Sequence, residues 1–443
     1  GCLDSTEKQI TLIPTFNIAD GSYYQDFETA VEGWSTSPLN PGGRNSWTWS
    51  PVTGGHFPYN APSGTIAWYT VLPQPEMVEN SGVYSPCFNF EGVGRPVLTL
   101  DIRRSMDRDR EGAVIQYTAD NGSIWKNVGK VDNGGLNWYN SSRIPNGPAG
   151  QSTGWTGTTA ETEDPDWLTA MHHLDDLINK KEIRFRIVYG SRGDNTIRNE
   201  GFAFDNFRIG QRSKMLVMEY FTNANDYACV NPDGLVNTLA NNLYKDVFDI
   251  QYHTSFPSPD RMYTDNPTPS SARGLYYGVS DVPYLVIDGG GFDFVNQLPD
   301  SNDILIRALM DPEFSIDLQI NQLSPFIQVT VNIEALKDIP KKELTLHTVI
   351  LEVLINDPLY IGTNGVSEFE STARQMLPDA GGTTFDKTWA EGETEEVIIT
   401  WNEPFEYLNE DNIAIVVFLQ DYNTKEILQA DGYSTEVHLT SSH

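Results

Sequence analysis

Cysteine, long apolar runs and basic residues are all scarce in this sequence. Its three cysteines in 443 residues, Cys2, Cys87 and Cys229, are too few and too scattered for a disulfide framework or a zinc site. No apolar run approaches the roughly 20 residues that a membrane-spanning helix needs. There are 29 Lys and Arg against 61 Asp and Glu, giving a net charge of −32. Such a field repels phosphate, so nucleic acid is excluded as a partner.

Familiar catalytic patterns are missing as well. The sequence has no Ser-His-Asp signature, no Gly-rich phosphate loop and no metalloprotease His pair. We therefore predict a protein that is not an enzyme. The chain is rich in turn formers, with 36 Gly and 26 Pro, and aromatics make up 11% of it. This composition is typical of short strands joined by turns, and the length requires several domains. The predicted fold class is multi-domain and mainly β.

The chain opens with Gly1-Cys2, followed by a polar stretch that contains Asp4 and Glu7. This start resembles a mature bacterial lipoprotein, in which the cysteine carries lipid. The acidic stretch resembles the export signal of Bacteroidetes surface lipoproteins. The resemblance implies lipid attachment at Cys2, a tether over residues 1–22, and an outer-membrane lipoprotein exposed at the cell surface. The alternative is a chance cysteine near one end of the chain.

Residues 23–212 contain short strand-like runs separated by Gly, Pro and Asn. Three of these runs cover 97–102, 113–117 and 183–189. The sequence Asp120-Asn121-Gly122 follows the second run and predicts a hairpin turn, since Asn-Gly tolerates positive φ. Residues 164–179 differ, because their apolar residues recur at helical spacing and predict one amphipathic helix.

Four segments of this region share one resemblance. They are QDFETAVEGW (25–34), YSPCF (84–88), TADNGSIW (118–125) and, most specific, EGFAFDNFRI (200–209). They resemble the jelly-roll domains of the cleaved-adhesin, choice-of-anchor and MAM-like group. The resemblance implies an adhesin-like jelly roll that binds a ligand and does not catalyse a reaction.

Some members of that group hold calcium near the first and last strands. The matching carboxylates here are Asp26, Glu28 and Asp205. Calcium takes six to eight oxygen ligands, so these three supply only part of a site. The resemblance therefore implies a possible calcium cofactor. The alternative is two polar strand residues and an aspartate at a turn.

Three tryptophans of the same region lie in stretches rich in Gly, Pro and Asn. They are Trp47, Trp49 and Trp138. Exposed Trp side chains stack on sugar rings, so these three are the candidate ligand-binding residues for carbohydrate. Packing in the core is the alternative.

The pattern changes after residue 212. An uninterrupted apolar run over 215–221 indicates a strand buried on both faces. Helical and strand-like segments then alternate over 234–245, 248–252, 271–277 and 283–287. The order strand, helix, strand, helix, strand is typical of an α/β domain, here predicted over 213–310.

Motifs of this segment include EYFT (219–222) and VPYLVIDG (282–289). They resemble the thioredoxin-like domain of a family of Bacteroidetes outer-membrane proteins. The resemblance puts Pro283 at the place of the cis-proline beside the redox site. Aligning the Phe-Thr pair puts Asp226 where redox members have the first cysteine of Cys-x-x-Cys, and Cys229 at the second.

An aspartate cannot form a mixed disulfide, so the usual dithiol exchange is excluded. We expect Asp226 to cap a helix N-terminus instead. Cys229 is either a reactive single thiol or a partly buried cysteine without a redox role.

Residues 311–443 contain further strand-like runs with polar turns between them. The runs cover 314–320, 327–333, 344–355, 395–401 and 413–420. Their spacing predicts an antiparallel β-sandwich domain. The segment 413–430 resembles the closing hairpin of the same outer-membrane family.

The leading functional hypothesis is a non-catalytic envelope lipoprotein that adheres to a glycan or to an envelope or host protein. A second hypothesis is a structural or assembly subunit of an outer-membrane complex, with the thioredoxin-like domain used for docking. A third is a monothiol redox protein that acts through Cys229.

Overall fold

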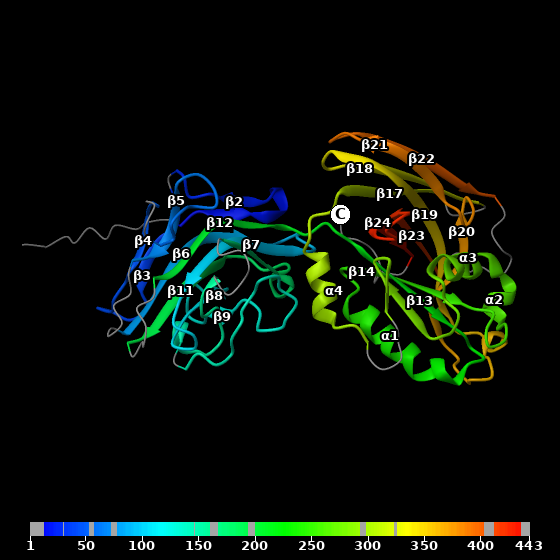
Figure 1. The fold of residues 1–443 in the computed structure, drawn as a ribbon, viewed down its shortest axis with the longest axis horizontal. Coiled ribbons are helices and arrows are strands. Elements are labelled where there is room, and N and C mark those ends of the chain that lie inside the picture. The colour runs from blue at the N-terminus through cyan, green and yellow to red at the C-terminus, as the bar shows by residue number, and fades with distance from the viewer. Residues whose placement is uncertain are drawn as a thin grey trace, which may run out of the picture. The chain divides into compact units, whose positions relative to one another are not determined.

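The computed structural model describes residues 13–29, 31–52, 57–71, 78–145, 147–159, 167–193, 200–292, 298–322, 326–402 and 412–435. The chain divides into two compact units, Gly1–Arg212 and Ser213–His443. Both are built mainly from strands (Figure 1), which agrees with the mainly β fold class predicted from the sequence. Among the described helices, none has the length and apolar character needed to cross a membrane.

Two six-stranded sheets form the first unit. One has the strand order β1-β6-β11-β8-β9, with β3 also paired to β6. The other has the order β10-β7-β12-β5-β4, with β2 paired to β12. The strands are β1 (Thr15–Asn17), β2 (Tyr23–Gln25), β3 (Ser35–Pro38), β4 (Trp47–Pro51), β5 (Ile66–Thr70), β6 (Val78–Asn89), β7 (Pro96–Ser105), β8 (Glu111–Thr118), β9 (Lys126–Asn127), β10 (Leu168–His173), β11 (Ile183–Arg192) and β12 (Gly201–Gln211).

Aromatic rings from both sheets fill the space between them. Phe88 on β6 stacks with Phe207 on β12, with ring centroids 6.4 Å apart. Phe204 on β12 lies 6.4 Å from the ring of Trp68 and 5.7 Å from that of Trp47. Each of these side chains is at least nine-tenths buried. The unit is therefore a sandwich with an aromatic core, as expected when the inner faces of two sheets interdigitate.

The strands predicted at 97–102, 113–117 and 183–189 are confirmed as β7, β8 and β11. The turn after β8 adopts the positive φ expected of it, with Asn121 at 56° and Gly122 at 88°. The helix predicted over 164–179 is wrong. Its described part is β10, which pairs with β7, followed by a short 3-10 turn at Asp175–Leu177. Pairing with a sheet edge here overrides the helical spacing of the apolar residues.

The second unit contains a nine-stranded mixed sheet and a three-stranded sheet. The large sheet has the order β16-β15-β13-β14-β20-β19-β23-β24, with β21 also paired to β19, and the small sheet has the order β17-β18-β22. The strands are β13 (Leu216–Thr222), β14 (Val247–His253), β15 (Tyr284–Ile287), β16 (Gly290–Phe292), β17 (Phe314–Gln322), β18 (Ile327–Ala335), β19 (Ile339–Ile355), β20 (Phe369–Leu377), β21 (Thr383–Trp389), β22 (Thr394–Trp401), β23 (Ile413–Asp421) and β24 (Ile427–Ser434).

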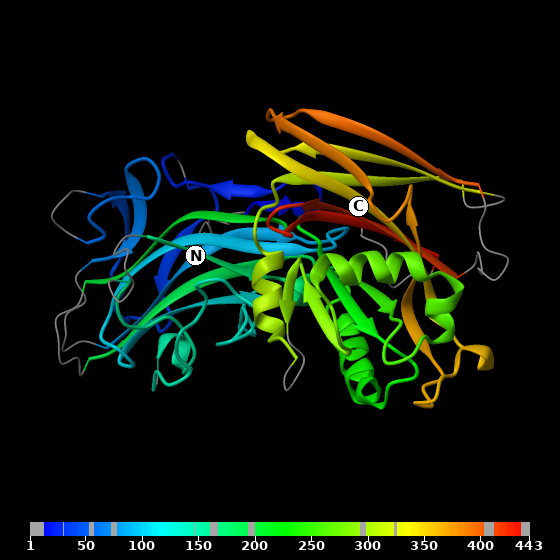
Figure 2. The same cartoon turned by 45° about the vertical axis from the view of Figure 1, so that its right-hand side comes forward.

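Helices cover the part of the large sheet that holds β13, β14 and β15 (Figures 1 and 2). They are α1 (Val230–Asn242), α2 (Arg261–Asp265), α3 (Pro267–Tyr277) and α4 (Ser301–Ala308). Even-numbered residues of β13 share a core with α1 and α4. Odd-numbered residues, such as Val217, face the opposite core, which also contains part of α3. The small sheet packs on β19, β23 and β24.

One sheet joins the segments 213–310 and 311–443, which the sequence analysis expected to be two domains. Strand β14 of the first segment pairs with β20 of the second, where Gln251 is opposite Thr372. The two segments therefore lie in one compact unit, Ser213–His443. Without β20, β14 would be an edge strand with unpaired backbone N–H and C=O groups. Pairing with β20 removes that exposed edge.

Candidate functional site

Two of the three tryptophans expected to bind carbohydrate belong to the core. Trp47 is 6% exposed and Trp138 is 7% exposed. Their indole Nε1 atoms donate to the carbonyl oxygens of Ser81 at 3.2 Å and Val128 at 3.0 Å. This burial contradicts the prediction that they stack on a ligand. Trp49 is half-buried and donates to the carbonyl of Phe27 at 2.9 Å.

The three carboxylates expected to hold calcium serve local structure. Glu28 accepts from the backbone N–H groups of Thr65 at 2.8 Å and Ile66 at 2.6 Å. Asp26 accepts from the backbone N–H of Glu28 at 3.2 Å. Within the described residues, no three His, Cys, Asp or Glu side chains are grouped so that they could hold a metal ion. An oxygen of Asp26 and of Glu28 is thus engaged by backbone donors, and calcium binding at Asp26, Glu28 and Asp205 stays a prediction.

Asp205 is fully buried beside other acidic groups. Its carboxylate accepts from the backbone N–H of Asn206 at 2.8 Å. Burial raises the pKa of Asp205 to about 8, and the nearby charges of Asp101 and Glu28 act in the same direction. A carboxyl group with such a pKa is partly protonated near neutral pH, which makes it a poor cation ligand.

Cys2 lies outside the described residues, so lipid attachment there stays a prediction. In the second unit, the structure shows Val282-Pro283 as a cis peptide, as the thioredoxin-like resemblance implied. Asp226 accepts from the backbone N–H of Ala228 at 2.9 Å and caps the turn that leads into α1. The predicted capping role of Asp226 is confirmed.

Cys229 is fully buried. Burial raises the pKa of its thiol to about 12, while a hydrogen bond with Thr222 opposes the rise. A thiol with that pKa holds almost no thiolate at neutral pH, and the thiolate is the nucleophile. Of the two alternatives for Cys229, the structure therefore favours a buried cysteine without a redox role.

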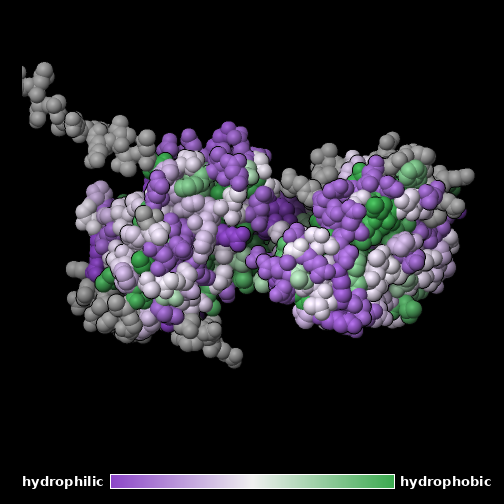
Figure 3. Space-filling model, turned by 90° about the horizontal axis from the view of Figure 1, so that it is seen from above, coloured by the Kyte–Doolittle hydropathy of each residue, from purple (hydrophilic) through white to green (hydrophobic). Residues whose placement is uncertain are grey.

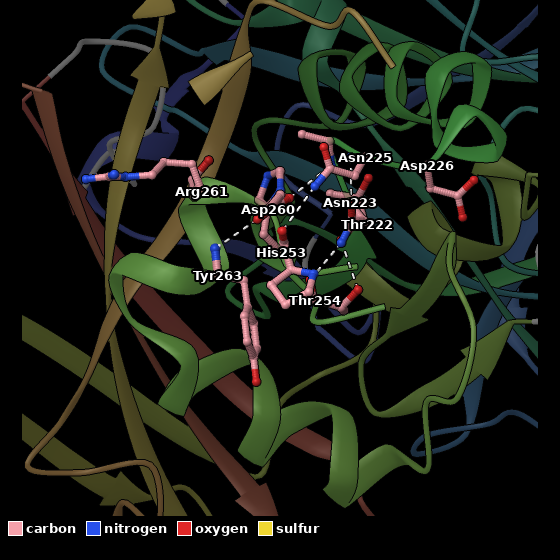
Figure 4. A network of polar contacts seen from close by, with 12 residues as sticks. Thr222, Asn223, Asn225, Asp226, His253, Thr254, Asp260, Arg261 and Tyr263 are labelled. Carbon is pink, nitrogen blue, oxygen red and sulfur yellow. Dashed lines mark hydrogen bonds and ion pairs between the residues drawn. The ribbon is translucent and has the colours of Figure 1, made fainter. Parts of the chain in front are cut away.

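A network of hydrogen bonds centred on Asp260 occupies the end of β13 and β14 (Figure 4). His253 Nδ1 lies 2.6 Å from Asp260 Oδ2. The same carboxylate accepts from the backbone N–H groups of Ala224 and Tyr263, each at 2.9 Å. Burial raises the pKa of Asp260, but the charge of His253 and these donors outweigh it, so the pKa lies below its usual range.

Three asparagines fix the loop 223–226, which contains Asp226. Asn223 Nδ2 donates to the carbonyls of Thr254 at 2.7 Å and Ser258 at 3.0 Å. Asn225 Nδ2 donates to the carbonyl of Pro259 at 3.0 Å. Asn364 Nδ2 reaches the carbonyls of Asn223 and Asp226 at 3.3 and 3.2 Å. The loop is held as a structural element, with its polar groups directed to neighbouring backbone.

The first unit offers a different candidate site, a groove of about 440 Å³ on the outer face of its first sheet. Two aromatic and two basic side chains line it: Tyr84, Trp125, Arg184 and Arg186. Arg184 and Arg186 point to the same side of β11, because side-chain direction alternates along a strand. Their neighbours on β11, Phe185 and Ile187, are buried in the core. We call this feature the Trp125 groove.

Cross-strand neighbours assemble the Trp125 groove. On β11, Arg186 is opposite Tyr84 of β6 and Gln116 of β8. Arg184 is opposite Cys87 and Thr118 on the same two strands. The Asn121-Gly122 turn brings Trp125 back over this face. The positive φ of Gly122 suits a residue without a Cβ.

Cations and rings alternate in the groove. The Arg186 guanidinium carbon lies 4.1 Å from the centroid of the Trp125 ring, and that of Arg184 lies 5.3 Å from the centroid of Tyr84. Tyr84 and Trp125 meet edge to face with centroids 5.8 Å apart. All four side chains are half-buried, so each presents part of its surface to solvent. Such contacts hold the groove in one shape.

The sequence does not by itself predict the Trp125 groove. It predicts the hairpin that carries Trp125, but the candidate ligand-binding residues were placed in other segments rich in Gly, Pro and Asn. The available signal was the alternation Arg184-Phe185-Arg186-Ile187, which places two arginines on the outer face of a strand. Their partners Tyr84 and Trp125 come from two other segments, which only the strand pairing identifies.

No family model and no curated protein sequence matches the chain. Among solved structures, HBP35 of Porphyromonas gingivalis matches with a TM-score of 0.42 at 15% identity, over 51% of this chain and 76% of that one. The K1 cleaved adhesin domain of Lys-gingipain from the same organism gives 0.26 at 10% identity, over 43% and 98%. A domain of its outer-membrane lipoprotein Omp28 gives 0.19 at 16% identity, over 28% and 88%. The structural neighbours thus include outer-membrane and adhesin domains at low identity.

Proposed function

We propose that this chain is a non-catalytic protein of the bacterial cell envelope that binds a glycan at the Trp125 groove of its first unit. The observation that carries the proposal is the set of half-exposed rings and guanidinium groups on one sheet face. Aromatic side chains contact the apolar faces of sugars, and polar groups beside them fix the orientation of the hydroxyls. In this groove the exposed Asn121 supplies such a group.

The location belongs to the same proposal. We take Cys2 as the lipid attachment point and the outer membrane as the anchor, with the binding unit exposed at the cell surface. The acidic net charge of −32 suits an exposed, soluble protein. On the face seen in Figure 3, hydrophilic and neutral residues cover most of the surface of each unit, and smaller hydrophobic patches are scattered among these residues.

The second unit acts in this proposal as a thioredoxin-like scaffold without redox chemistry. Its topology supports the assignment: β13 and β14 are parallel and linked through α1, and β15 pairs antiparallel with β13. The loop that holds the dithiol in redox relatives is fixed here by Asp260 and the asparagines. The burial of Cys229 argues against the monothiol alternative.

An assembly subunit is the second candidate function, and one observation favours it. Three exposed apolar side chains belong to the segments that meet at the loop 223–226: Tyr227 at 73% directly follows it, and Leu359 at 73% and Ile361 at 45% precede Thr363, which bonds to Asn225. Exposed apolar groups close together mark protein interaction sites. Stoichiometric co-purification of a partner from detergent extracts, lost in a Tyr227→Ser/Leu359→Ser variant, would support this function over glycan adhesion.

A glycan array tests the leading proposal. The full chain, a Trp125→Ala variant and a Tyr24→Ala variant are compared. Tyr24 is the matched control, because it is an exposed aromatic side chain of the same unit outside the groove. We expect glycan binding by the full chain and by Tyr24→Ala, and loss of binding in Trp125→Ala. An array with no bound glycan, or binding unaffected by Trp125→Ala, would contradict the proposal.

A further inference from the structure

The Trp125 groove carries two basic side chains in an acidic protein. Acidic residues outnumber basic ones by 61 to 29 in the chain, yet two arginines lie two residues apart at the groove. Within the described residues, neither Arg184 nor Arg186 forms an ion pair with a carboxylate. Their polar contacts are to neutral oxygens.

The contacts of each arginine leave its charge uncompensated. Arg184 donates from Nε to the carbonyl of Ser85 at 2.8 Å and from a terminal nitrogen to Ser35 Oγ at 3.4 Å. Arg186 donates twice to Gln116 Oε1, at 2.9 and 2.6 Å. Burial lowers the pKa of both guanidinium groups. Both stay protonated at neutral pH.

The only carboxylate that lines the groove among the described residues is that of Glu182. Its side chain is exposed, and it lies at the edge of β11, next to the end of the strand. One exposed carboxylate against two half-buried guanidinium groups leaves a local excess of positive charge. A surface of this kind attracts an anion despite the acidity of the whole chain.

Geometry selects the kind of anion. In each arginine Nε and Nη2 bind protein oxygens, which leaves the Nη1 donors for a ligand. Such charged donors match the oxygens of a carboxylate or sulfate. The guanidinium groups of Arg186 and Arg184 lie over one face of the Trp125 and Tyr84 rings, and the parts of these half-buried rings that remain exposed offer apolar contact to a sugar ring. An inorganic anion would use the charged donors alone, and a neutral sugar would use the rings alone.

We propose that the Trp125 groove binds an acidic saccharide, one whose sugar rings carry carboxylate or sulfate groups. This inference rests on the proposed glycan-binding function and names its ligand class. Arg184 and Arg186 bind the acidic groups, while Tyr84 and Trp125 contact the ring that carries them.

The test compares matched acidic and neutral ligands on the full chain by isothermal titration. One pair is a tetrasaccharide of galacturonic acid and its methyl ester, in which methylation removes the charge of each carboxylate. The other is a sulfated galactan tetrasaccharide and its desulfated form. We expect the acidic member of at least one pair to bind about tenfold or more tightly than its neutral partner, since charge-assisted hydrogen bonds are about twice as strong as neutral ones. Added salt should reduce this difference.

Variants assign the effect to the groove. Arg184→Gln should remove most of the preference for the acidic ligand and keep the binding of the neutral one. Arg184→Lys should restore part of the preference, because it keeps the charge without the guanidinium group. Arg208→Gln is the matched control, since Arg208 is an exposed arginine on β12, in the other sheet, and changes the net charge equally. Circular dichroism shows whether each variant is folded.

The outcomes separate this inference from the proposed function. Equal binding of acidic and neutral saccharides, lost in Trp125→Ala, would overturn the inference and leave glycan binding in place. Binding of neither kind would overturn both. A poly-aspartate peptide that binds as tightly as the acidic saccharide would also overturn the inference, because charge alone would then be recognised. An equal loss in Arg208→Gln would show that net charge, and not the groove, sets the preference.

Discussion

His253 Nδ1 lies 2.6 Å from Asp260 Oδ2, in the interior of the second unit. The two side chains are 2% and 3% exposed. Asp260 also holds the backbone N–H groups of Ala224 and Tyr263. Through these contacts one carboxylate links β14, α2 and the loop that precedes α1. The end of β13 and β14 is thus held by an arrangement that stabilises the fold.

Replacing this carboxylate should destabilise the second unit. In Asp260→Asn the side chain loses its charge and one acceptor oxygen, and two buried backbone donors compete for the remaining one. Losing one partner of a buried pair costs about 3–5 kcal/mol in the free energy of unfolding. Urea denaturation should show this loss, and Asp311→Asn, at an exposed aspartate, should leave stability unchanged. An Asp260→Asn variant as stable as the parent would mean that the network contributes little.

The same carboxylate makes stability depend on pH. The pKa of Asp260 is below its usual range in the folded protein, so the folded state binds its proton less tightly than the unfolded state. Its contribution is therefore present above the unfolded pKa of about 3.9 and is lost as the pH falls through the folded pKa. The stability difference between the parent and Asp260→Asn should shrink on acidification below about pH 4. A difference that stays constant down to pH 2 would contradict the assigned role.

Asp205 should show the opposite pH dependence in the first unit. Its pKa is raised to about 8, so the folded state favours the protonated carboxyl. The stability linked to that proton is complete below the unfolded pKa and is lost as the pH rises through about 8. We expect Asp205→Asn to become more stable relative to the parent between pH 5 and pH 9. Thermal unfolding at the two pH values measures this, and a gain in parental stability on adding calcium would contradict it.

Tryptophan substitutions should separate core residues from groove residues. Trp138→Ala leaves a cavity beside Trp155 and Tyr139, and truncation of a buried Trp costs about 3–5 kcal/mol. Trp125→Ala should cost far less, because its ring is partly in solvent. Chemical denaturation of the two variants gives the comparison. Equal losses would place Trp125 in the core and remove it as a binding residue.

Cysteine labelling tests the absence of thiol chemistry. With its pKa raised to about 12 and its side chain fully buried, Cys229 should resist iodoacetamide in the native protein at pH 8. Cys87 is half-buried and serves as the internal comparison, expected to react slowly. Mass spectrometry before and after unfolding measures both. Rapid native labelling of Cys229 would revive the monothiol hypothesis.

The sequence predicted the strands best where hydrophobic runs are continuous, as in β13 and β23. It failed for 164–179, where Trp167, Met171, Leu174 and Ile178 have helical spacing but the chain pairs with β7. It also gave no strand at 369–377, although β20 bridges the two parts of the second unit. Pairing between distant segments decides such cases, and local periodicity does not report it.

The same limit explains the misplaced binding residues. Trp47 and Trp138 sit among Gly, Pro and Asn in the sequence, which is typical of exposed loops, but their rings turn inward and their indole nitrogens bind backbone carbonyls. Trp125 and Arg186 are 61 residues apart in the chain and meet through the pairing of β8 with β11. By contrast, the cap formed by Asp226 was predictable, because capping depends on residues close in sequence.

The most direct test of glycan binding is ¹⁵N NMR of the tryptophan indole N–H groups in the full chain. Trp→Phe variants assign each resonance, and the acidic tetrasaccharide that binds more tightly is then added stepwise. We expect the chemical shift of the Trp125 resonance to change as ligand is added and to reach a plateau at saturation. Those of Trp47 and Trp138, whose N–H groups bond to Ser81 and Val128, should stay in place. An unchanged Trp125 resonance at saturating ligand, or a shift confined to Trp47, Trp49 or Trp138, would contradict the account.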